Sequence, residues 1–129
     1  MTEIRAEHFP LEEETDAIIH GAIEVHKDLG MGFLEIVYKD ALEVEFKKHA
    51  IPFSREKLYP VEYSGVVLKH FFVADFVGFD SVILEIKAKK EITIDDIAQT
   101  RNYLKCSKCE VGLILNFGKD TLQIKRVVF

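Results

Sequence analysis

Apolar residues recur along this chain at two spacings, which predict its helices and strands. From about residue 11 to Leu29 they recur every three or four positions, and Gly30 follows, so we expect a helix that ends at the glycine. The same spacing over residues 33–49 predicts a second helix, which Pro52 ends. A third helix should begin at Thr93, because Thr93 and Asp96 resemble a capping box.

Five stretches with strand character complete the pattern. The first is interrupted by Pro60, which indicates an edge or bulged strand, and its acidic residues Glu56 and Glu62 are expected to face solvent. The second and third are strongly apolar and are joined by a tight turn at Gly78–Ser81. The expected strands are residues 53–64, 66–77, 82–88, 111–117 and 122–128.

This order of elements predicts the fold class. Helix, helix, strands, helix, strands is typical of an α/β fold with a mixed β-sheet flanked by helices. A chain of 129 residues has the usual size of one compact domain, so we expect a single domain over residues 1–129. Residues 1–10 carry little pattern and are expected to lie loosely on the surface.

Composition and charge narrow the possible classes of protein. A content of 48% hydrophobic and 30% charged residues is that of an ordinary soluble protein, and no apolar run approaches the ~20 residues of a membrane span. The first residues lack a secretory signal, so we expect a cytoplasmic protein with no membrane partner. The net charge of −5 argues mildly against nucleic acid, but residues 65–129 carry 8 acidic and 10 basic side chains, a net +2.

The two cysteines are a weak metal signal. Cys106 and Cys109 form a single Cys-x-x-Cys pair, whereas a structural zinc site needs four ligands. We interpret them as two reduced thiols at the end of the third helix.

The candidate chemistry lies in the apolar strand pair. Glu85 and Lys87 are two apart and therefore share a strand face, and a hairpin that turns near Phe79 brings Asp75 level with Glu85. Burying such charges costs several kcal/mol each unless they are paired or bind a metal. Two interpretations are open from the residues alone: a structural ion-pair triad, or a metal site.

Further residues extend this set. Gln99 and Tyr103 are four apart on the third helix, on a flank different from its expected buried face of Ile94, Ile97, Ala98 and Leu104. Glu35 lies at the edge of the apolar stripe of the second helix, and on pattern alone a solvated glutamate is the simpler reading.

Taken together, these residues resemble the core of the PD-(D/E)XK nuclease superfamily in its RecB-like, lambda-exonuclease-like form. The resemblance rests on Asp75, the Glu85-x-Lys87 pair and the Gln99-x-x-x-Tyr103 pair, in that order. Gly32, Glu35 and Tyr38 are also similar to the motif of the GxxExxY family, as are the stretches VHKDLGMGFLEIVY, VADF, ILEIKA, QTRNYLK and LNFG. Ala74 stands where the superfamily name has proline, whose side chain binds no metal.

The resemblance implies a restriction-endonuclease-like core and a nuclease that cleaves DNA or RNA with Mg²⁺ or Mn²⁺. By resemblance, Asp75, Glu85 and the Ile86 carbonyl would hold the ion, with Glu35 as a further ligand. Lys87 would orient or help deprotonate the attacking water. Gln99 and Tyr103 would position that water or the nucleic-acid backbone.

Two other possibilities stay open. The chain could be a non-catalytic nucleic-acid- or protein-binding module that has kept the nuclease scaffold. It could also be a subunit that is active only as a homodimer or within a larger assembly.

Overall fold

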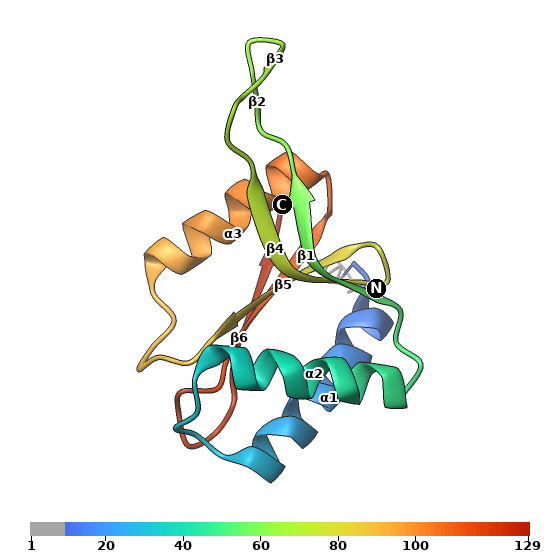
Figure 1. The fold of residues 1–129 in the computed structure, drawn as a ribbon, viewed down its shortest axis with the longest axis vertical. Coiled ribbons are helices and arrows are strands. Elements are labelled where there is room, and N and C mark those ends of the chain that lie inside the picture. The colour runs from blue at the N-terminus through green and yellow to red at the C-terminus, as the bar shows by residue number, and fades with distance from the viewer. Residues whose placement is uncertain (1–9) are drawn as a thin grey trace, which may run out of the picture.

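Figure 1 shows the computed structural model, which describes residues 10–129. The expectation that residues 1–10 lie loosely on the surface falls mostly outside this range. Pro10 differs from it, because Pro10 is buried and its carbonyl accepts a hydrogen bond from the Arg126 guanidinium.

The three predicted helices are present: α1 (Glu12–Leu29), α2 (Glu35–Lys48) and α3 (Ile94–Ser107). Helix α1 ends at Gly30, whose φ of 71° is left-handed and whose N–H bonds the His26 carbonyl. Helix α3 begins at a complete capping box, in which the Thr93 side chain accepts from the Asp96 N–H and the Asp96 side chain accepts from the Thr93 N–H. None of the described helices is long and apolar enough to cross a membrane.

Five strands form the main sheet, in the order β1-β4-β5-β6-β7. The β5–β6 pair is parallel, with α3 between the two strands in sequence, and the other neighbours are antiparallel. The predicted α/β fold with a mixed sheet is therefore confirmed. The strands of the chain are β1 (Phe53–Tyr59), β2 (Glu62–Tyr63), β3 (Val66–Val67), β4 (Phe72–Gly78), β5 (Val82–Lys87), β6 (Val111–Asn116) and β7 (Gln123–Val128).

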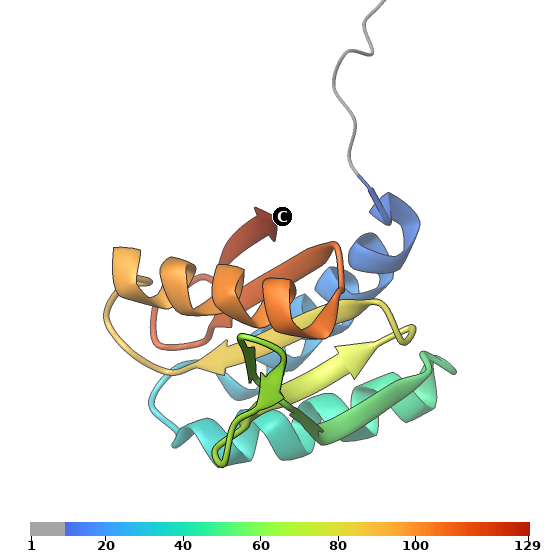
Figure 2. The ribbon, with the colours of Figure 1, turned by 90° about the horizontal axis from the view of Figure 1, so that it is seen from above.

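Helices cover both faces of this sheet, as the two views show (Figures 1 and 2). One apolar cluster joins α1 and α2 to the sheet through side chains such as Ile18, Phe46 and Phe76. A smaller cluster joins α3 to the opposite face through Ile83 and Leu104. Because β5 and β6 are buried from both sides, every residue of β6 is buried, as expected for central strands of a covered sheet.

The expected long strand over residues 66–77 is wrong in its first half. Residues 66–67 pair with Glu62 and Tyr63 in a small separate hairpin that projects from the body of the molecule (Figure 1). Only the part from Phe72 onward joins the main sheet. The β2 and β3 residues are all exposed, so no apolar face forces this segment onto the main sheet.

Candidate active site

Asp75 and Glu85 meet between strands β4 and β5. The β4–β5 ladder runs from Gly78–Val82 to Phe76–Leu84, which places the next pair, Asp75 and Glu85, level with each other. There, side chains replace ladder bonds: the Asp75 N–H donates to Glu85 Oε2 at 3.3 Å, and the Ile86 N–H donates to Asp75 Oδ2 at 2.8 Å. The tight turn thus sets a register that brings two carboxylates together.

The electrostatics of this pair are unfavourable in the absence of a cation. Glu85 is 5% exposed, and burial together with the charge of Asp75 raises the pKa of Glu85 to about 8. The Asp75 N–H and the charges of Lys87 and Lys39 oppose this shift without cancelling it. Near neutral pH the buried carboxyl therefore holds a proton for much of the time.

Lys87 follows Glu85 on the same strand but its amine is directed to α3. The Lys87 Nζ lies 3.8 Å from Asp96 Oδ1, and Lys89 Nζ lies 2.7 Å from Asp96 Oδ2. Although burial raises the pKa of Asp96, the hydrogen bonds from Lys89 and Thr93 outweigh it, and the net pKa is lowered. Asp96, in the first turn of α3, is therefore the acid that pairs with Lys87. The expected convergence of this amine on both carboxylates is replaced by an electrostatic influence on Glu85.

The ammonium that contacts Asp75 belongs to Lys39 on α2, which the sequence interpretation missed. Lys39 Nζ lies 3.2 Å from Asp75 Oδ1 and 2.5 Å from Glu56 Oε2, and the residue is 8% exposed. Burial disfavours its charged form, but the bond to Glu56 and the charge of Asp75 prevail and raise the pKa of Lys39. Its four-residue spacing from Glu35, on the same helix face, was the available signal.

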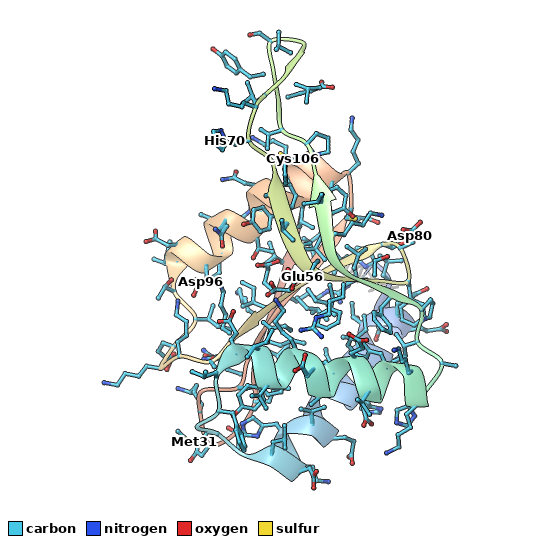
Figure 3. All side chains as sticks on the ribbon, viewed as in Figure 1. Met31, Glu56, His70, Asp80, Asp96 and Cys106 are labelled. Carbon is cyan, nitrogen blue, oxygen red and sulfur yellow. The ribbon has the colours of Figure 1, made fainter. Side chains whose placement is uncertain are left out.

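Glu56 is exposed, as expected, but its carboxylate also binds Lys39, which the sequence did not predict. The β1–β4 ladder passes from Arg55–Phe76 to Lys57–Ala74 and skips the level of Glu56 and Asp75. Glu56 there has a left-handed φ of 58°. Figure 3 labels Glu56 on β1, the strand at the edge of the main sheet.

The two strands change faces at this level. On one side of the level of Glu56 and Asp75, Phe53 of β1 and Phe76 of β4 pack in the cluster under α1 and α2. On the other side, Tyr59 of β1 and Phe72 of β4 pack in the cluster under α3. The two β1 residues are an even number of positions apart, as are the two β4 residues, so in a regular strand each two would share a face. The irregular backbone at Glu56 and Asp75 explains why alternation alone could not place these carboxylates.

Glu35 begins α2 close to the same centre. Although the residue is exposed overall, partial desolvation and the charge of Asp75 raise the pKa of Glu35, against the effect of Lys87. Tyr38 explains why the helix begins there: its fully buried hydroxyl donates to the Gly30 carbonyl at 2.6 Å and accepts from the Phe33 N–H at 3.2 Å. The tyrosine thus fixes the connection from α1 and the position of Glu35.

Gln99 and Tyr103 of α3 differ in their exposure and contacts. Tyr103 is half-buried and stacks on Phe72, with ring centroids 3.9 Å apart. Burial and the charges of Glu85 and Asp75 raise the pKa of its hydroxyl, so Tyr103 lies within electrostatic range of the carboxylates. Gln99 is exposed. The expected buried face of α3 is wrong at two positions, because Ile94 is 84% exposed and Ala98 is exposed.

A divalent cation fits this donor set. Among residues 10–129, no three His, Cys, Asp or Glu side chains lie close enough to hold an ion together. Mg²⁺, however, commonly takes only one or two carboxylates and completes its shell with water and substrate. Asp75 and Glu85 supply two hard oxygen ligands whose mutual repulsion a cation would relieve. The Ile86 N–H bonds Asp75, so its carbonyl points to the same side of β5.

None of the cavities described among residues 10–129 is lined by Asp75 or Glu85. One of about 480 Å³ lies along α1 and is lined by His20, Glu24 and His49 among others, none of them predicted for the site. Cys106 and Cys109 are free and partly buried. The acid pair on β4 and β5 is thus the centre of candidate chemistry.

Comparison with known proteins identifies a similar fold and the superfamily. The solved structure titled "Crystal structure of SSO0001" superposes with a TM-score of 0.60 and 18% identity over 92% of this chain, which spans 59% of that protein. At this identity the likeness concerns the fold alone. No curated protein sequence matches the chain. Residues 12–127 match the PD-(D/E)XK nuclease superfamily, and the chain therefore belongs to that superfamily.

Proposed function

We propose that this protein is a metal-dependent nuclease that hydrolyses phosphodiester bonds of DNA or RNA. The observation that carries the proposal is that Asp75 and Glu85 lie side by side: the Asp75 N–H donates to the Glu85 carboxylate, and the Ile86 N–H donates to the Asp75 carboxylate. Lys87 lies two residues after Glu85 on β5. A buried acid with a raised pKa beside a second, partly buried acid is typical of functional sites. Membership in the nuclease superfamily supports the same chemistry.

Each residue has a role in this proposal. Asp75, Glu85 and the Ile86 carbonyl would hold a Mg²⁺ or Mn²⁺ ion, with Glu35 as a further ligand. When bound, the ion activates water and neutralises charge on the phosphate oxygens. Lys87, anchored by Asp96, orients the attacking water and stabilises developing negative charge. Tyr103 and Gln99, on α3, contact the nucleic-acid backbone.

The finer resemblance, to the GxxExxY family, is part of the proposal. The contacts of Tyr38 support it, because the tyrosine hydroxyl bonds the backbone of Gly30 and Phe33, on either side of Gly32 and just before Glu35. In this arrangement the tyrosine ties down the turn, and the glutamate one helical turn earlier is presented to the site.

The test is a cleavage assay with purified protein. Single- and double-stranded DNA and RNA are incubated with Mn²⁺ or Mg²⁺, and products are resolved on a gel. We expect cleavage by the wild type, no cleavage in EDTA, and loss of at least 100-fold in Asp75→Asn and Glu85→Gln. Activity that persists in both variants would point to a contaminant and refute the proposal.

A binding assay separates the nuclease from a non-catalytic scaffold. Titration calorimetry with Mn²⁺ should give binding that is lost in Glu85→Gln. A well-folded wild type that binds no Mn²⁺ and cleaves none of the four substrates would favour the scaffold instead.

A further inference from the structure

Lys39 is held between two carboxylates that belong to different strands. Its ammonium lies 3.2 Å from Asp75 Oδ1 on β4 and 2.5 Å from Glu56 Oε2 on β1. The Lys39 side chain is 10% exposed, whereas the Glu56 side chain is 50% exposed. The lysine therefore lies inside, with one inner and one outer acid as partners.

The inner partner is the proposed metal ligand, and its two oxygens have different neighbours. Asp75 Oδ2 accepts the Ile86 N–H at 2.8 Å, which fixes the carboxylate between β4 and β5. Oδ1 is the oxygen that faces Lys39. A divalent cation bound at Asp75 would share this carboxylate with an ammonium at contact distance, and two positive charges so close repel each other strongly where water is scarce.

The outer partner has a backbone suited to hold the lysine. Glu56 has a left-handed φ of 58° inside a strand, a conformation that L-residues with a long side chain rarely adopt. This conformation falls at the level where β1 changes faces, and it accompanies the contact of the Glu56 carboxylate with α2. Lys39 therefore has an acceptor to remain on when Asp75 binds a metal.

We propose that Lys39 is an internal counter-ion that competes with the divalent metal for Asp75, and that Glu56 retains Lys39 when the metal binds. The inference rests on the proposed function, because it takes Asp75 as a metal ligand. It assigns Lys39 and Glu56 a positioning role distinct from that of Lys87, whose amine is anchored by Asp96 on α3. The pair sets the metal concentration at which the site fills.

The proposal makes opposite predictions for its two residues. Lys39→Met keeps the apolar stem and removes the competing charge, so Mn²⁺ should bind about 10-fold more tightly. Glu56→Gln leaves Lys39 with Asp75 as its charged partner, so Mn²⁺ should bind about 3- to 10-fold more weakly. In the double variant the affinity should match that of Lys39→Met within roughly threefold, because no lysine is left for Glu56 to retain.

Titration calorimetry with Mn²⁺ on the purified chain measures these affinities. Lys57→Met is the matched control, since Lys57 is a neighbouring lysine of β1 that pairs with Asp80 at 3.5 Å and gives the same change in net charge. Its affinity should equal that of the wild type. Glu62→Gln, on the exposed β2 strand, is the corresponding control for Glu56→Gln.

A second measurement is made without metal. In EDTA, Lys39→Met should unfold at a lower temperature than wild type, because Asp75 loses its cation, and saturating Mn²⁺ should raise its melting temperature more than that of wild type. If Lys39→Met is too unstable to purify, Lys39→Gln serves in both measurements.

The outcomes are separable. Wild-type protein that binds no Mn²⁺ refutes the metal site and the competition with it. Wild-type binding that is unchanged or weakened in both Lys39 variants refutes the competition alone and leaves the proposed function standing. Equal tightening in Lys57→Met also refutes it, because the effect would then be one of net charge.

Discussion

Glu85 links the site to the stability of the fold, because its carboxyl has a different proton affinity in the folded and unfolded chain. Its pKa is near the ordinary 4.5 when unfolded and about 8 when folded. The folded state thus binds more protons between these values. The stability from this group is fully present below about pH 4.5 and is lost as pH rises through about 8.

The first prediction follows from this linkage. In EDTA, the free energy of unfolding of wild type should fall between about pH 5 and pH 9, by up to about 5 kcal/mol from this group. Glu85→Gln, which cannot ionise, should show a much smaller fall and should be more stable than wild type near pH 9. Urea unfolding across this range measures both, and parallel curves for the two proteins would contradict the prediction.

Lys87 gives the second prediction at this scale. Lys87→Met should lower the cleavage rate by about 10²–10⁴-fold, because it removes the amine that orients water and stabilises charge. Mn²⁺ affinity should change less than in Lys39→Met, since the Lys87 amine lies beside Asp96 and Lys39 contacts Asp75 directly. Lys90→Met, an exposed neighbour, is the control and should cleave at the wild-type rate. A fully active Lys87→Met variant would remove the motif lysine from the mechanism.

Some contacts at the site could be predicted from the sequence and others could not. The level of Asp75 with Glu85 was predictable because a strand period of two and a tight turn determine the register of β4 and β5. Lys39 and Glu56 were not found, because their contact joins segments 17 residues apart and depends on a left-handed backbone in β1. No local periodicity reports such a contact.

Helix α3 is the element that anchors the motif lysine. Its capping box joins Thr93 and Asp96, and the same Asp96 carboxylate pairs with Lys87 and Lys89. The start of the helix and the position of the lysine are therefore one structural unit. Ile94 remains exposed because the box, and not an apolar contact, determines where the helix begins.

The third prediction concerns this box. Thr93→Ala removes the acceptor for the Asp96 N–H and should lower the free energy of unfolding by about 0.5–2 kcal/mol. Thr93→Ser keeps the hydroxyl and should stay within about 0.5 kcal/mol of wild type. Chemical unfolding measures both, and equal stability of the alanine variant would show that the cap contributes nothing.

The fourth prediction concerns the end of β6, where Gly118 packs against the backbone of Lys89 just after β5. A Cβ at Gly118 would collide with the Lys89 backbone nitrogen and carbonyl oxygen. Gly118→Ala should therefore destabilise the protein by more than about 2 kcal/mol, because backbone held by Asn116 cannot easily shift. Gly65→Ala, where nothing lies within 4 Å, has only its φ of 76° to strain and should cost about 1 kcal/mol.

At the scale of the whole molecule, the sheet and its helices form the core, and the β2–β3 hairpin lies outside it. Neither apolar cluster contains a residue from 60–71, and Figure 1 shows this segment projecting from the sheet. Tyr59 and Phe72 at its base face each other directly in the β1–β4 ladder. The hairpin is thus an insertion between two strands that could be joined by a tight turn.

The fifth prediction tests this description. Replacement of residues 60–71 by an Asn-Gly turn should preserve cooperative unfolding, because no core contact is removed and a shorter loop costs less entropy to close. The melting temperature should stay within about 5 °C of wild type or rise. A truncated protein that loses its cooperative transition would mean that the hairpin supports the fold.

The sequence by itself determined the three helices, the mixed main sheet and the meeting of Asp75 with Glu85, because each follows from short-range periodicity, caps and a tight turn. The tertiary structure alone decided which cations serve these acids: Lys39 comes from α2, held by Glu56 on β1, and Lys87 is drawn to Asp96 on α3. It also decided where β1 and β4 change faces. These outcomes depend on packing between elements distant in sequence. A charge that this packing buries must pair with an opposite charge nearby, because an unpaired buried charge is costly.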